Sequence, residues 1–132
     1  MSNLLAVLVD GQAQLEFDHG RQVPQQQLDY LDGMDARMDA GIVLDGEQIS
    51  APDGDARVKF VAQNLATALV EGNDKLAIAM CTYLGVRRPA LKQVKISLGE
   101  LGMSVDLDYE NAYEKPAPQP QVVTFDPGKL NG

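Results

Sequence analysis

The feature that most constrains the fold is an apolar run from Leu4 to Val9, which ends at an Asp10-Gly11 pair. Asp-Gly supplies the positive φ angles of a two-residue hairpin turn, and the next segment, 12–17, alternates polar and apolar residues. A strand that is apolar on both faces is expected to be buried on both faces. The sequence therefore predicts an N-terminal hairpin whose first strand is central in a sheet. An uninterrupted ladder across the turn would put Leu4, Ala6 and Leu8 on the same face as Phe17, Leu15 and Ala13.

Three helices are expected after this hairpin. The first is opened by Pro24, carries apolar residues at steps of three and four, and ends at Gly41. A short hairpin is expected around Asp45-Gly46. The second helix begins at Asp53 or Asp55 and ends at Gly72. Asn73 caps the third helix, which is apolar nearly all round and is expected to end at Gly85.

Two alternating segments, 93–98 and 103–110, predict a second hairpin, with Lys95 opposite Asp106. The fold class is therefore α+β, with antiparallel hairpins from the N- and C-terminal segments and a three-helix insert packed on one face. We expect residues 1–112 to form a single domain. Residues 113–132 are expected to be a Pro-rich extended tail, in which 121–125 either adds an edge strand or stays a loose extension.

Composition limits the class of protein. The chain of 132 residues holds no run of about 18 apolar residues, so no membrane span is expected. A single cysteine and the absence of a basic leader at the start favour the cytoplasm. The net charge of −8 argues against a general nucleic-acid binder, because phosphate binding needs cationic patches.

The charge is unevenly distributed. Residues 75–99 carry a charge of +5 and the remainder −13. Arg87 and Arg88 follow a helix end, where cations meet unpaired carbonyls, a contact worth about 1 kcal/mol or less. Paired arginines also bind carboxylate or phosphate, so the candidate anion- or partner-binding residues are Arg87, Arg88, Lys92 and Lys95.

Other chemistry-bearing residues have structural interpretations. Cys81 lies late in an apolar helix, where a core position is expected and a reactive thiolate is disfavoured. His19 is expected in an exposed turn, without the His or Cys spacing of a metal site. Phosphate-loop and nucleophile-elbow motifs are absent from the sequence. The acidic series on the first predicted helix is expected to face solvent: Asp29, Asp32, Asp35 and Asp39.

The sequence therefore favours a small, non-catalytic cytosolic accessory protein that acts by binding another protein, with no cofactor and no metal. The alternative is a small anionic-ligand-binding or enzymatic domain with a site near Arg87 and Arg88. Exposed strand edges and apolar sheet surface also predict a homodimer.

Overall fold

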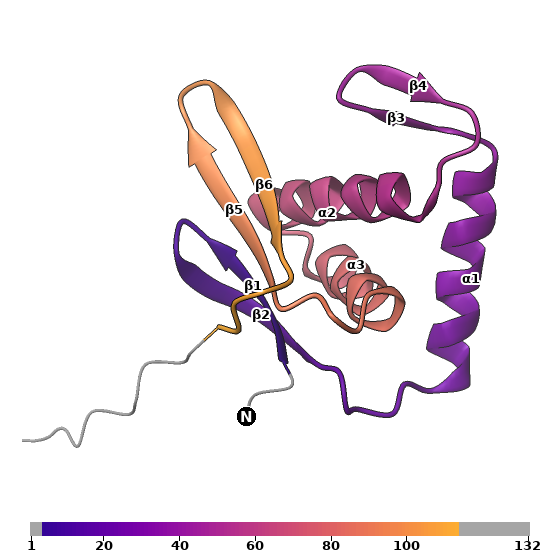
Figure 1. Ribbon diagram of the computed structural model, residues 1–132, viewed down its shortest axis with the longest axis horizontal. Helices are drawn as coiled ribbons and strands as arrows, with labels where there is room; N and C mark the ends of the chain where they lie inside the picture. The colour runs from indigo at the N-terminus through magenta and orange to yellow at the C-terminus, as the bar shows by residue number, and fades with distance from the viewer. Residues whose placement is uncertain (1–3, 114–132) are drawn as a thin grey trace, which may run out of the picture.

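The computed structural model describes residues 4–113, which form a four-stranded sheet, a small two-stranded sheet and three helices (Figure 1). The larger sheet has the order β2-β1-β5-β6, and its two hairpins are antiparallel. Parallel pairing of β1 with β5 joins the hairpins, so β1 is a central strand, as predicted. The class is α+β. The strands are β1 (Leu4–Val9), β2 (Gln12–Asp18), β5 (Gln93–Gly99) and β6 (Gly102–Asp108).

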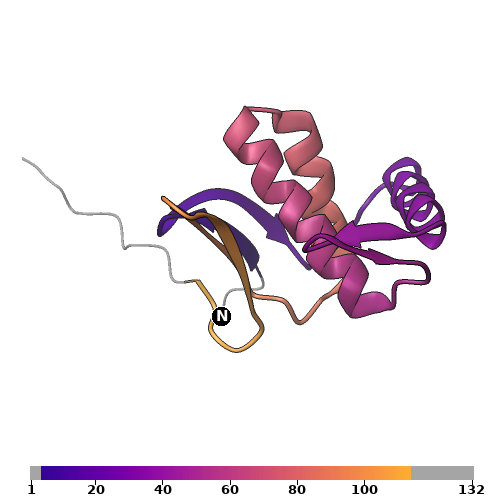
Figure 2. The same cartoon turned by 90° about the horizontal axis from the view of Figure 1, so that it is seen from above.

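The helices lie on one side of this sheet in two layers (Figure 2). They are α1 (Gln25–Asp39), α2 (Gly54–Glu71) and α3 (Asp74–Arg87). The antiparallel α2–α3 pair lies next to the sheet, and α1 lies beyond that pair. The predicted short hairpin is present as β3 (Ile42–Leu44) and β4 (Glu47–Ile49), near α2. The described helices include none that is long and apolar enough to cross a membrane.

The residues predicted to cap and to end α2, and to cap α3, do so in the structure. The Asp53 carboxylate accepts the Ala56 N–H at 2.8 Å and caps the start of α2. Gly72 ends α2 in the left-handed region, with φ of 75°. The Asn73 side chain then accepts the Leu76 N–H at 3.3 Å and caps α3. The Gly72 and Asn73 conformations fix the corner between the two helices.

Helix α3 continues past Gly85 to Arg87, so the predicted end at Gly85 is wrong. A Cβ atom at Gly85 would lie 2.2 Å from Cδ2 of Phe17, well inside van der Waals contact. The glycine therefore serves close packing between α3 and β2 rather than helix termination. Pro89 follows soon after the observed end and prevents further continuation.

The register of the first hairpin also differs from the prediction. A β-bulge between Val7 and Leu8 shifts the ladder, so Leu5 pairs with Phe17 and Val7 pairs with Leu15. A one-residue shift moves a strand's side chains to the opposite face. Leu5 and Val7 therefore share a face with Phe17, and all three belong to the core cluster.

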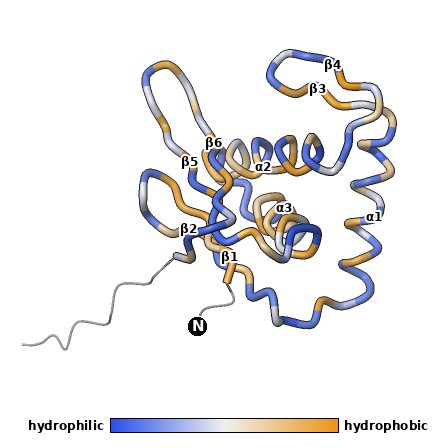
Figure 3. Tube along the Cα trace, in the orientation of Figure 1, coloured by the Kyte–Doolittle hydropathy of each residue, from blue (hydrophilic) through white to orange (hydrophobic). Residues whose placement is uncertain are grey.

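The core lies between the sheet and the α2–α3 pair. The second hairpin has the predicted register, with Lys95 opposite Asp106, which turns Val94 and Ile96 to the core. Apolar segments of the central strands and of α2 and α3 gather toward this region (Figure 3). The largest fully buried side chains are Leu5, Val7, Leu31, Val61, Leu65, Leu84, Leu91, Val94 and Ile96.

Candidate functional site

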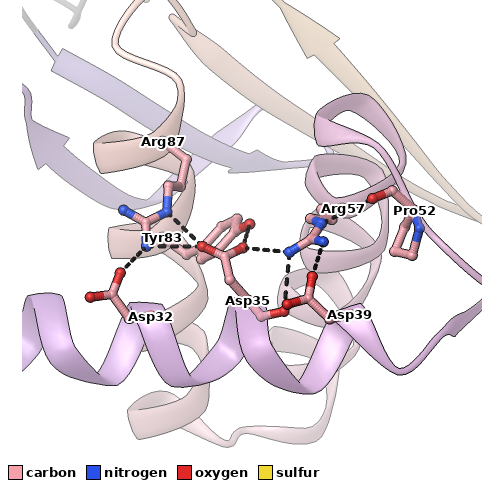
Figure 4. A network of polar contacts seen from close by, with 7 residues as sticks. All are labelled: Asp32, Asp35, Asp39, Pro52, Arg57, Tyr83 and Arg87. Carbon is pink, nitrogen blue, oxygen red and sulfur yellow. Dashed lines mark hydrogen bonds and ion pairs between the residues drawn. The ribbon is translucent and has the colours of Figure 1, made fainter.

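Arg87, one of the predicted anion- or partner-binding residues, belongs to a network of polar and charged side chains that joins the three helices (Figure 4). We call this network the clamp; its members are Asp32, Asp35 and Asp39 on α1, Arg57 on α2, and Tyr83 and Arg87 on α3. Arg57 also donates to the backbone carbonyl of Pro52, before α2, at 3.1 Å. The clamp therefore attaches α1 to both helices of the inner layer.

Asp35 is the centre of the clamp. Its Oδ1 accepts the Tyr83 hydroxyl at 2.6 Å and Arg57 Nη1 at 3.3 Å. Its Oδ2 accepts Arg87 Nε at 3.1 Å and lies 3.0 Å from Arg87 Nη2. Arg57 also pairs with Asp39, and Arg87 with Asp32 at 2.9 Å. Both carboxylate oxygens of Asp35 are thus engaged by donors of this chain.

The prediction that the acidic series of α1 faces solvent holds for Asp29, Asp32 and Asp39, which are exposed, but is wrong for Asp35. Asp32 and Asp39 extend to cations of α2 and α3, and the Asp35 side chain is only 28% exposed. Burial, together with the hydrogen bond to Asp35, raises the pKa of Tyr83 to about 12. A phenol so held stays protonated, which suits a structural hydrogen-bond donor.

The other basic candidates contact separate elements. Arg88 Nη2 lies 2.9 Å from Asp55 at the start of α2. Lys95 Nζ lies 2.9 Å from Asp108 within the second hairpin. Lys92 is half-buried, and its backbone N–H donates to the Asp108 carbonyl at 2.9 Å. Their role in anion or partner binding stays a prediction; an anion at the arginines or Lys95 would compete with a carboxylate already in place.

His19 is not the exposed turn residue that the sequence indicated. The imidazole is partly buried, with Nδ1 3.1 Å from the Gly85 carbonyl and Nε2 2.8 Å from the Leu91 carbonyl. Its ring also meets Phe17 edge-on, with centroids 5.8 Å apart. These contacts connect the turn after β2 to the last turn of α3 and to the loop between α3 and β5, which is a structural role.

Cys81 is buried, as predicted, with 4% of its surface exposed. Burial raises the pKa of its thiol to about 12. A thiol of this kind is protonated near neutral pH and shielded from solution, so it is a poor nucleophile.

A groove between β6 and α2 is the feature that sequence reasoning missed. Its volume is about 820 Å³. One wall comes from consecutive residues of β6, and the other comes from positions of α2 one turn apart. Asp45, at the β3–β4 turn, also lines the groove. The lining residues are Asp45, Asp55, Val58, Lys59, Ala62, Gln63, Met103, Ser104, Val105, Asp106, Leu107 and Tyr109.

The groove continues along most of β6. A second hollow of about 260 Å³, lined by Thr67, Val70 and Leu98, shares Met103 with the first. Met103 is 40% exposed and Val70 is 58% exposed, so apolar surface remains open to solvent along this path. We call the two hollows together the β6 groove. The alternation of apolar residues along 103–109 indicates a strand with one apolar face, but it does not show whether a helix covers that face.

Comparison with protein-family models, with curated proteins and with solved structures finds no match to this chain. Within residues 4–113, no group of three or more His, Cys, Asp or Glu side chains is placed to hold a metal ion. Candidate functions therefore rest on the geometry of the groove and of the charged residues.

Proposed function

We propose that the protein is a non-catalytic accessory module that binds another polypeptide in the β6 groove. The supporting observation is an elongated groove with exposed apolar residues beside an edge strand of the sheet. Exposed apolar surface of this kind is typical of protein-binding sites. Edge strands also offer unpaired backbone N–H and C=O groups to a partner.

The chemistry-bearing residues of the described chain support a binding role over a catalytic one. Asp35, Tyr83 and Arg87 hold one another in the clamp, His19 contacts two backbone carbonyls, and Cys81 is buried. The alternative, an anion site at Arg87 and Arg88, has less support because each guanidinium already has a carboxylate within 3.0 Å.

The test compares two variants in affinity capture from the native source. Met103→Glu places a charge in the groove at a half-exposed position, so the fold should persist. Leu101→Glu makes the same chemical change at a fully exposed position of the β5–β6 turn, outside the groove lining. We expect proteins captured by the wild type to be retained by Leu101→Glu and lost by Met103→Glu. Equal capture by both variants would reject the groove as the binding site.

A further inference from the structure

The two edges of the larger sheet are not equivalent. On β2, the inward-facing Phe17 is 7% exposed, and a β-bulge interrupts the pairing with β1. On β6, the ladder with β5 is regular over all seven residues. A bulge is a usual protection of an edge strand. By this criterion β6 is the edge that is more available to pair with another strand.

The two faces of β6 have opposite character. Met103, Val105 and Leu107 lie on the helix side, opposite Leu98, Ile96 and Val94 of β5. Ser104, Asp106 and Asp108 lie on the other side, and Asp106 stands opposite Lys95. A strand added beside β6 would place its alternate side chains next to these two rows. One row of the added strand would meet apolar residues and the other would meet carboxylates.

The charge of the groove agrees with this pattern. Its lining holds four carboxylates, on Asp45, Asp55, Glu71 and Asp106, and one cation, on Lys59. Asp55 forms an ion pair with Arg88, and Asp108 forms one with Lys95. Asp106, on the outer face of β6, is attracted to Lys95 only at longer range. The whole chain carries a net charge of −8, so a second copy would bring further negative charge to the groove.

We infer that the β6 groove takes an extended segment of a partner in which apolar residues alternate with Lys or Arg, bound as a fifth strand beside β6. This inference rests on the proposed function and names the chemistry of the partner. Backbone hydrogen bonds to β6 provide the attachment, as in other cases of strand addition. The apolar row packs between β6 and α2, and the cationic row meets Asp106, which sets the selectivity.

The probe is a synthetic seven-residue peptide that alternates Lys and Val, with blocked ends, titrated into the full-length protein. Amide chemical shifts report where it binds. We expect the shifts to move along β6 and in the groove wall of α2. A peptide with Glu in place of Lys is expected to bind at least about tenfold more weakly. A Lys-Val peptide N-methylated at every second residue should also bind more weakly, because it loses backbone donors.

Asp106→Lys should reverse the preference between the Lys and Glu peptides, and Asp106→Asn should reduce it. Asp29→Lys, which changes an exposed carboxylate on α1 in the outer layer, should leave the preference unchanged. Melting curves of the variants check that each is folded. Equal binding of the two peptides, or shifts confined to β2, would overturn the inference. If Met103→Glu still abolishes the capture of proteins from the native source, the proposed function stands even when the inferred peptide chemistry is rejected.

The inference of a partner strand would also be overturned if the groove had one of two other occupants. If the chain's own segment 121–125 occupies the groove, Val122→Pro with Val123→Pro will change the β6 amide shifts without any peptide. If a second copy does, light scattering will show a dimer that Met103→Glu dissociates. We expect neither change.

Discussion

Gly85 and Gly33 both lie inside helices, but their surroundings differ. A Cβ atom at Gly85 would overlap the Phe17 ring, whereas a Cβ at Gly33 meets no atom within 4 Å. We expect Gly85→Ala to lower the free energy of unfolding by about 1–3 kcal/mol, because the ring has little room to move. Gly33→Ala should instead raise it by about 0.5–1 kcal/mol through helix propensity.

Denaturant unfolding of the two glycine variants measures both effects in one series. Equal effects of the two substitutions would contradict the close packing of Phe17 on α3.

Cys81 is predicted to react slowly with thiol reagents. Its side chain is 4% exposed and its thiol has a pKa of about 12, so few molecules present an accessible thiolate at neutral pH. Labelling should become fast and stoichiometric only after denaturation. Rapid labelling of the native protein at pH 7 would mean that α3 opens readily.

At the scale of elements, the clamp is expected to hold α1 in place. Asp35→Asn removes the charge that Arg57 and Arg87 share and leaves two partly buried cations without it. We expect a loss of about 1–3 kcal/mol in the free energy of unfolding. Arg88→Gln removes an ion pair whose partner, Asp55, is 79% exposed, and should cost about 1 kcal/mol or less. Chemical denaturation of the two variants measures this difference, and similar losses would contradict a special role for Asp35.

The end of the second hairpin should respond to pH. The Asn111 N–H, together with Lys95 and the Glu110 N–H, lowers the pKa of Asp108 well below its usual range. The pKa of Asp108 is lower in the folded protein than in the unfolded chain. The charged carboxylate therefore stabilises the folded state fully above the ordinary aspartate pKa of about 3.9, and this contribution is lost as acid protonates the carboxylate in the folded protein. Asp108→Asn should therefore lower the melting temperature most at neutral pH, with the difference shrinking in strong acid.

Asp29→Asn serves as the control, because its carboxylate accepts one exposed side-chain hydrogen bond. A difference between Asp108→Asn and wild type that is constant from pH 7 to strong acid would contradict the role of the carboxylate charge.

Much of this element structure could be predicted from the sequence, because its causes are local. The Asp10-Gly11 turn, the Asp53 and Asn73 caps and the alternation around Lys95 each act within a few residues. The bulge, the parallel pairing of β1 with β5, and the clamp depend on residues distant in the chain. Asp35 and Arg87 are 52 positions apart, and nothing local to either indicates the contact. The groove was missed for the same reason.

At the scale of the whole molecule, the two helix layers are attached by different forces. The sheet and the α2–α3 pair share the main apolar core, while α1 contributes three buried side chains and the clamp. Salt screens partly exposed ion pairs more than apolar contacts. We therefore expect amide hydrogen exchange in α1 to accelerate in high salt, with little change in β1 and β5. Uniform acceleration across all elements would contradict this layered stability.

The homodimer stays a prediction, and attraction between the basic segment 75–99 of one copy and the acidic surface of another contributes little to it. Of the basic residues between 75 and 99, Arg87, Arg88 and Lys95 are paired within the chain. They are less free to attract the acidic surface of a second copy.

The parallel pairing of β1 with β5 also has a consequence during synthesis. Ala6 pairs with Gln93, so the ribosome must make three helices before the first strand meets its second neighbour. Until then the nascent chain carries a strand that is apolar on both faces and paired on one side only. Such strands are the segments that aggregate or engage chaperones. A chain that stops before β5 should therefore be removed by cellular quality control, however well its helices form.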